Sequence, residues 1–202
     1  MVKVCGLTQP GNISDIITMG VDLIGLNFYP PSPRYIAQPP VFKKENAKVV
    51  GVFANEAPDV ICQKVSEFSL DLVQLHGDED EVVCREVASF VPVIKVFRLA
   101  GTLDEKSLKT YSFCEYYLFD TATPAYGGSG TKFNWKMLSD IDIPKSFFLS
   151  GGIGPGDAQD LKRINIPNFF GIDINSRFET GPGIKDTGAI SRFLQELKNL
   201  SV

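Results

Sequence analysis

Two residues at the ends of short apolar segments could carry out proton transfer. Cys5 ends the segment VKVC, and Asp120 follows the apolar run YYLF. A thiolate can act as a base where cations or a helix dipole stabilise it. Burial favours the protonated form of a carboxyl group, which then can act as an acid. The alternative interpretations are a core thiol for Cys5 and a loop cap for Asp120.

Two further side chains could bind a ligand. Arg34 lies on the proline-rich loop PPSPR, and a guanidinium can bind a carboxylate or a phosphate through two parallel hydrogen bonds. The alternative interpretation of Arg34 is a charged loop residue that only contacts solvent. His76 follows the segment LVQL, where a ligand contact and an ordinary satisfied histidine are equally compatible with the sequence.

Eight short apolar segments must position these residues. They are rich in Val, Ile, Leu and Phe, which is typical of strands buried on both faces. Their first residues lie near positions 2, 23, 49, 72, 93, 116, 147 and 169, about 24 residues apart on average. Helix signals between them predict helices at 12–20, 58–68, 80–90 and 186–200, with a short or irregular helix within 101–113.

This alternation predicts an α/β fold in which parallel strands are joined by right-handed helical crossovers. Eight strand–loop–helix units predict a compact (β/α)8 TIM barrel, formed by residues 1–202 as a single domain. A doubly wound open sheet is the alternative. Glycine-rich and polar residues gather just after the seventh and eighth segments, where barrels commonly bind phosphate, and this favours the barrel.

The loops after the last three predicted strands have separate expected roles. Gly151 and Gly152 precede a predicted helix with Pro155 in its first turn, so free backbone amides there could bind phosphate. The DINS segment, 173–176, would lie beside them after the eighth strand. The loop YGGSGTKFNW, 126–135, is long enough to act as a mobile cover.

Composition narrows the class of protein. Twenty Lys and Arg against 24 Asp and Glu give a net charge of −4, which argues against a nucleic-acid partner. One histidine and four scattered cysteines argue against a metal site. With no apolar segment near the roughly 18 residues of a membrane span and no apolar signal region, we expect a cytoplasmic protein without a membrane partner. Its thiols should be free, with Cys62, Cys84 and Cys114 filling the core.

Taken together, several segments resemble the phosphoribosylanthranilate isomerase family, the barrel enzymes of tryptophan biosynthesis. They run in order over nearly the whole chain: KVCGLT, IGLNFYPPSPRYI, VGVFAN, VQLHGDE, LFDT, YGGSGTKFNW, LSGGIGP and GIDINSRFETGPGIKD. The resemblance implies an Amadori rearrangement of N-(5-phosphoribosyl)anthranilate to 1-(2-carboxyphenylamino)-1-deoxyribulose 5-phosphate. It also implies a small-molecule phosphoribosyl substrate, no cofactor, and a monomer or homodimer.

The resemblance assigns roles to individual residues. Cys5 matches the general base and Asp120 the general acid. The substrate-binding set is Arg34, His76 and Asp173. The phosphate-binding set is Gly151, Gly152, Asn175 and Ser176. Asn175 and Arg177 stand where the family commonly has serine and glycine.

Two other functions remain as alternatives. One is another sugar-phosphate isomerase on the same barrel, such as the histidine-pathway enzyme. That enzyme is expected to use carboxylates at both catalytic positions, whereas this chain has Cys5 at one of them. The other is a non-catalytic barrel that binds a phosphorylated ligand as a sensor. Such a protein would need the phosphate loops but not the pair Cys5 and Asp120.

Overall fold

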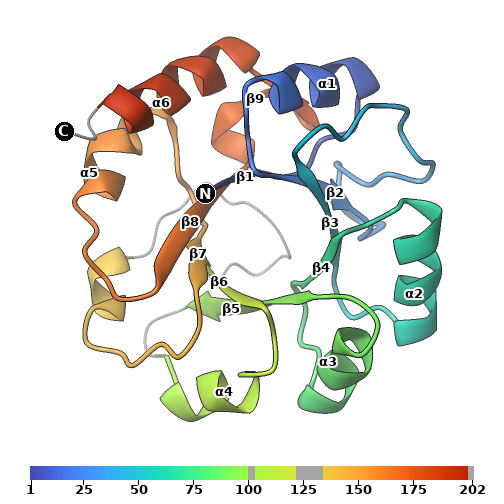
Figure 1. Ribbon diagram of the computed structural model, residues 1–202, viewed down its shortest axis with the longest axis vertical. Helices are drawn as coiled ribbons and strands as arrows, with labels where there is room; N and C mark the ends of the chain where they lie inside the picture. Colours follow the sequence, from blue (N-terminus) through green and yellow to red (C-terminus); the bar gives the residue numbers. More distant parts are fainter. Residues whose placement is uncertain (100–102, 122–133, 200–202) are drawn as a thin grey trace.

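Eight parallel strands close into a barrel in their sequence order, β1 to β8, in a computed structural model that describes residues 1–99, 103–121 and 134–199 (Figure 1). The strands are β1 Val2–Val4, β2 Leu23–Asn27, β3 Lys48–Phe53, β4 Leu72–Leu75, β5 Val93–Leu99, β6 Tyr116–Thr121, β7 Phe147–Leu149 and β8 Phe169–Ile174. β1 pairs with both β2 and β8, which closes the ring. The predicted (β/α)8 TIM barrel is confirmed, and the open sheet was the wrong alternative.

Helices surround the strands on the outside of the ring (Figure 1). They are α1 Pro10–Thr18, α2 Pro58–Glu67, α3 Glu81–Ala88, α4 Glu105–Thr110, α5 Ala158–Lys162 and α6 Thr187–Asn199. The first helix begins two residues before the predicted start, because proline is tolerated in the first turn, where its missing N–H has no partner to lose. The short helix expected after the fifth strand is the six-residue α4.

The connection between β2 and β3 departs from the expected repeat of one helix per strand. Residues 28–47 contain no helix. Five prolines in this segment, at positions 30, 31, 33, 39 and 40, remove backbone donors and disfavour helical geometry in the residues before them. The expectation of a helix in every interval was therefore wrong here. The segment forms an extended loop that carries Arg34.

The strands bury side chains on both of their faces, as continuous apolar segments require. The outer faces pack against the helices in a large apolar cluster. A smaller cluster fills the barrel interior: Leu23, Val50, Leu72, Ile94, Val96, Leu118 and Phe148. Because strand side chains alternate with a period of two, Gln74 and His76 continue the inward face of Leu72, and Asp120 continues that of Leu118. The barrel interior is thus apolar in the layer formed by this cluster, and it becomes polar near the carboxyl ends of the strands.

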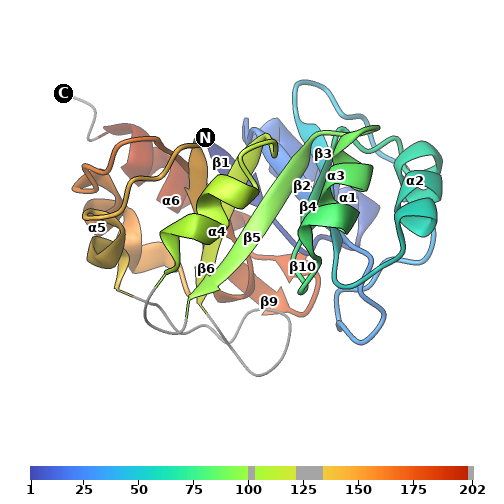
Figure 2. The ribbon, with the colours of Figure 1, turned by 90° about the horizontal axis from the view of Figure 1, so that it is seen from below.

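A hairpin follows β8 before the last helix. Its strands are β9 Glu179–Gly181 and β10 Ile184–Lys185, paired antiparallel. Figure 2 shows the hairpin at the end of the barrel where β5 and β6 terminate, opposite the N-terminus. Within the described ranges, the helices are too short or too polar to cross a membrane.

Candidate active site

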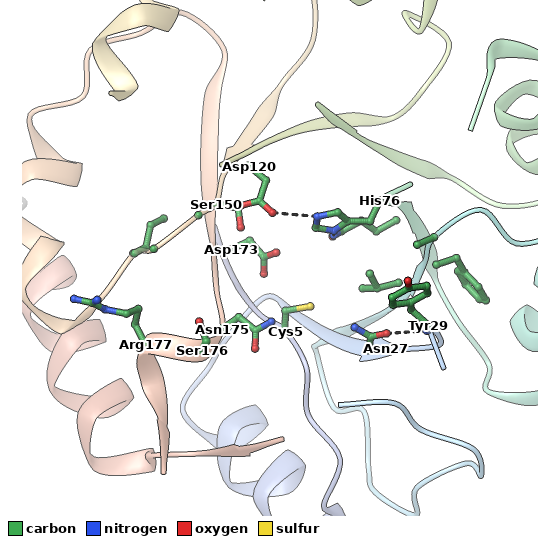
Figure 3. Close-up of a pocket in the computed structure, with 17 residues that line it drawn as sticks. Cys5, Asn27, Tyr29, His76, Asp120, Ser150, Asp173, Asn175, Ser176 and Arg177 are labelled. Carbon is green, nitrogen blue, oxygen red and sulfur yellow. Dashed lines mark hydrogen bonds and ion pairs between the residues drawn. The ribbon is translucent and has the colours of Figure 1, made fainter. Parts of the chain in front are cut away.

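A cavity opens at the carboxyl ends of the strands, and its polar side chains come from several of them (Figure 3). Its empty space, counted with its open mouth, is about 670 Å³. All predicted site residues except Arg34 line it: Cys5, His76, Asp120, Gly151, Gly152, Asp173, Asn175 and Ser176. The barrel therefore brings together residues that lie far apart in the sequence.

Cys5 lies just beyond β1 and is buried. Its amide donates a hydrogen bond to the Ile174 carbonyl at 2.9 Å, which fixes the thiol beside the end of β8. Burial raises the pKa of the Cys5 thiol, while the nearby ammonium groups of Lys3 and Lys185 act in the opposite direction without reversing it. The Asp173 carboxylate also raises that pKa, so the two cations offset only part of the combined effect on the thiol.

Lys3 forms a buried ion pair with Asp173 inside the barrel. Its Nζ lies 3.0 Å from Asp173 Oδ2, and its side chain is 0% exposed. Burial raises the pKa of Asp173, and Lys3 only partly offsets that effect. The other oxygen, Oδ1, is buried without a hydrogen-bond partner among the described residues, although Asp173 lines the cavity. Asp173 thus keeps one free acceptor.

Asp120, His76 and Gln74 form a hydrogen-bonded series across two strands. His76 Nε2 lies 3.0 Å from Asp120 Oδ2 (Figure 3). Gln74 Nε2 lies 2.9 Å from His76 Nδ1. Asp120 Oδ1 also accepts the Thr121 amide at 2.9 Å. All three side chains line the cavity. The carboxyl group of Asp120 is therefore held in place by its own strand and by β4.

Gly151 allows the loop after β7 to approach Asp120. Its φ of +82° is a left-handed conformation that favours glycine, and a Cβ there would lie 2.9 Å from Asp120 Oδ1. The following helix is short: a 3₁₀ turn at Pro155–Asp157 leads into α5. The Gly154 amide donates to Asp157 Oδ2 at 2.6 Å. The phosphate roles of Gly151, Gly152, Asn175 and Ser176 stay predictions.

Arg34 is not among the residues that line the cavity, and a carboxylate of the chain already binds it. Its Nε and Nη2 donate to Glu179 Oε1 and Oε2 at 2.8 and 2.5 Å. Burial acts to raise the pKa of Glu179, but hydrogen bonds from Arg34 and Lys185 outweigh it and lower that pKa. Lys185 Nζ also donates to Asn175 Oδ1 at 2.7 Å. The substrate-binding role of Arg34 remains a prediction.

Sequence reasoning missed Lys3, Gln74, Glu179 and Lys185. Lys3 and Gln74 each precede a predicted site residue by two positions within an apolar strand, so the strand period places them on the same inward face. That spacing was a usable signal. Glu179 and Lys185 lie in the β9–β10 hairpin, and their sequence spacing does not indicate a contact with Arg34.

Gly6 separates Arg34 from Asn175 and allows a stability test. Its φ is +71°, and an added Cβ would lie 2.5 Å from Arg34 Cδ and 2.7 Å from Asn175 Oδ1. We expect Gly6→Ala to lower the free energy of unfolding by about 1–3 kcal/mol, measured by urea denaturation. Gly11→Ala is the control, because helical Gly11 has nothing within 4 Å of an added Cβ. Equal unfolding free energies for the two variants would contradict this interpretation.

Other predictions for the site have different outcomes. The expected cover, 126–135, lies outside the described residues except for Asn134 and Trp135. Arg177 lines the cavity, but Figure 3 shows its guanidinium directed away from the central carboxylates.

All four cysteines are free thiols, and Cys62 is exposed on α2, so its predicted core position was wrong. No cluster of metal-binding side chains occurs in the described part of the chain.

The fold and the position of the cavity define a (β/α)8-barrel protein with a small-molecule site at the carboxyl ends of its strands. A family model described as N-(5'phosphoribosyl)anthranilate (PRA) isomerase matches residues 2–196. The N-(5'-phosphoribosyl)anthranilate isomerase of Phocaeicola vulgatus is 42% identical over 200 residues, which cover 98% of each chain. The chain therefore belongs to the N-(5'-phosphoribosyl)anthranilate isomerase family, and it is an isomerase of tryptophan biosynthesis.

Solved structures agree with this membership. The crystal structure of phosphoribosyl anthranilate isomerase from Thermotoga maritima superimposes with a TM-score of 0.84 at 35% identity, covering 98% of both chains. Another phosphoribosyl anthranilate isomerase, with a TM-score of 0.79 and 31% identity over 98% of both chains, was solved in complex with reduced 1-(o-carboxyphenylamino)-1-deoxyribulose 5-phosphate. The Thermotoga maritima protein is described as dimeric. The family resemblance seen in the sequence is confirmed.

Proposed function

We propose that this isomerase converts N-(5-phosphoribosyl)anthranilate to 1-(2-carboxyphenylamino)-1-deoxyribulose 5-phosphate with Asp120 as the general acid and Cys5 as the general base. The observation that carries these roles is a carboxyl group and a thiol that face one cavity from β6 and β1, with Asp173 between them in Figure 3. An acid and a base on two sides of a small sugar can act on two different atoms of it.

The acid step opens the sugar ring. Asp120 gives its proton to the ring oxygen, the bond from that oxygen to C1′ breaks, and the nitrogen lone pair forms an iminium with C1′. The ring oxygen leaves as a hydroxyl group that keeps the proton from Asp120. The positive nitrogen then acts as the electron sink, so the substrate itself supplies the activation that the next step needs.

The base step moves the double bond. The Cys5 thiolate takes the proton from C2′, and the electron pair of that bond neutralises the iminium to give an enolamine. A proton then adds to C1′ and the C2′ hydroxyl group gives up its proton, which yields the ketone, so the rearrangement neither oxidises nor reduces the molecule overall. Lys3 and Lys185 support the thiolate electrostatically, and the free Oδ1 of Asp173 can accept a sugar hydroxyl.

The two anionic groups of the substrate need separate partners. Arg34 uses its Nε and Nη2 edge on Glu179, and its Nη1 edge makes no hydrogen bond within the described ranges. We assign the anthranilate carboxylate to that edge. Because Lys185 binds Asn175 Oδ1, the Asn175 amide nitrogen remains a donor for the phosphate, beside Gly151, Gly152 and Ser176.

A fluorescence assay tests the proposal. The phosphoribosyl substrate is generated in place from anthranilate, and its consumption by the folded protein is followed. We expect turnover without added metal or cofactor. No consumption by a folded sample would instead favour a barrel that only binds a phosphorylated ligand. Preferred turnover of the aminoaldose of the histidine pathway would contradict the assigned substrate.

A further inference from the structure

We propose that Gln74 is a positioning residue that determines which nitrogen of His76 carries a proton and thereby controls the delivery of a proton to Asp120. This inference rests on the proposed role of Asp120 as the acid. It adds a residue that acts through His76 and does not itself touch the reacting atoms.

The geometry places Gln74 at the buried end of the series. Its side chain points inward from β4, two residues before His76, and the residue is 1% exposed. Its Nε2 lies 2.9 Å from His76 Nδ1, while its Oε1 is buried with no hydrogen-bond partner among the described residues. An unpaired buried acceptor is costly, so it calls for an explanation.

The amide orientation fixes the resting tautomer of His76. An amide nitrogen only donates, so His76 Nδ1 must accept and carries no proton. The single proton of the neutral ring is then on Nε2, where it donates to Asp120 Oδ2 at 3.0 Å. In this arrangement Asp120 is a carboxylate, and the pair of His76 and Asp120 has a charge of −1 and cannot yet act as an acid.

Uptake of one proton changes the requirement on Gln74. The added proton occupies His76 Nδ1, which now donates, so the amide must turn and present Oε1 as the acceptor. The second proton lies between His76 Nε2 and Asp120 Oδ2, and from Asp120 it can pass to the ring oxygen of the substrate. The pair is then neutral, and it returns to −1 after delivery. The unpaired Oε1 of Gln74 is thus the acceptor for His76 Nδ1–H once the pair of His76 and Asp120 has taken up a proton.

Other charged and titratable groups also face His76 across the cavity. They are Asp120 from β6, Asp173 from β8 and Cys5 after β1, and Arg177 lines the same cavity. Lys3 from β1 does not line it and is buried against Asp173. Lys3 and Asp173 form an ion pair, and only Asp120 and Gln74 hydrogen-bond the imidazole within the described ranges. Gln74 does not titrate, so it acts on His76 through the direction of one hydrogen bond.

Nitrogen NMR of isotope-labelled histidine tests this directly, because His76 is the only histidine of the chain. The free protein is titrated without substrate. We expect the Nε2–H tautomer at alkaline pH and protonation of Nδ1 as the pH falls. In Gln74→Glu the ionised side chain only accepts, so Nδ1–H should already be present at alkaline pH. Nδ1–H in the unmodified protein at alkaline pH, or an unchanged tautomer in Gln74→Glu, would overturn the proposal.

Activity provides the second readout. Gln74→Met keeps the length of the side chain without its hydrogen bonds, and we expect kcat to fall at least about tenfold with little change in KM. In Gln74→Glu the protonated form of the pair of His76 and Asp120 is favoured. The loss of activity with rising pH should therefore shift to higher pH. Gln63→Glu, which adds the same charge on the exposed face of α2, is the control. An unshifted profile in Gln74→Glu would indicate a purely structural residue.

The two levels of the proposal can fail separately. If the tautomer behaves as expected but the protein does not turn over the substrate, the proposed reaction is wrong while the role of Gln74 at His76 stands. If turnover is normal and the tautomer does not depend on Gln74, only the further inference is wrong. The spectrum of the unmodified protein decides the resting tautomer even if a Gln74 variant fails to fold.

Discussion

Cys5→Ala should lower kcat by at least about 10²-fold while the substrate still binds, because the variant lacks the base that we propose removes the C2′ proton. Alanine keeps the Cβ that lies close to Gly25 and removes only the sulfur atom. Single-turnover kinetics and fluorescence titration would separate the chemical step from binding. Cys62→Ala is the matched control, since that thiol is exposed on α2. Unchanged turnover in Cys5→Ala would remove Cys5 from the mechanism.

The pH dependence of kcat/KM provides a second test of Cys5. A base must be deprotonated to act, so activity is lost as the pH falls through the pKa of Cys5. Burial raises the pKa of Cys5 above its ordinary value, so the loss should begin on the alkaline side of neutrality. An exposed carboxylate base would lose activity only in the acid range. This loss of kcat/KM with falling pH should be absent from the residual activity of Cys5→Ala. If both proteins lost activity over the same pH range, the titrating group would have to be one other than Cys5.

Asp120→Asn should also lower kcat by at least about 10²-fold, because an amide cannot deliver a proton to the ring oxygen. The substitution keeps the shape of the side chain and an oxygen that can accept the Thr121 amide, so the fold should persist. We expect KM to change little, and the measurement is steady-state kinetics with circular dichroism as a check of folding.

An exposed carboxylate provides the control for Asp120. Asp15→Asn removes the same charge on the outer surface of α1 and should leave kcat unchanged. If both variants lost activity equally, the effect would follow net charge and not proton transfer. If Asp120→Asn retained full turnover, the acid would have to be another group at the cavity.

The barrel could be predicted from the sequence because its strands are buried on both faces. Segments such as VVGVF and YYLF are apolar without interruption, and their spacing leaves room for a helix between most of them. The prediction of a helix failed for the β2–β3 connection, because its prolines favour a loop. Cys5 and Asp120 could be found because each is a polar residue at the end of such a segment.

The partners of these residues were harder to predict. Gln74 and Lys3 could have been found from strand period alone, because polar residues two positions before His76 and Cys5 must face inward. The contact between Arg34 and Glu179 spans 145 positions and depends on how the β9–β10 hairpin returns to the barrel. No local pattern encodes such a contact. The direction of the Gln74 amide depends on three side chains at once and needs the structure.

The pairing of β1 with β8 has a consequence for how the enzyme becomes active during its synthesis. Lys3 and Asp173 form their ion pair across 170 positions of chain, so the thiol emerges from the ribosome long before the carboxylate that organises its surroundings. Contacts of such long sequence separation form late, after the loop-closure entropy has been overcome. Catalysis therefore awaits closure of the ring, and the onset of activity would report that event in a refolding experiment.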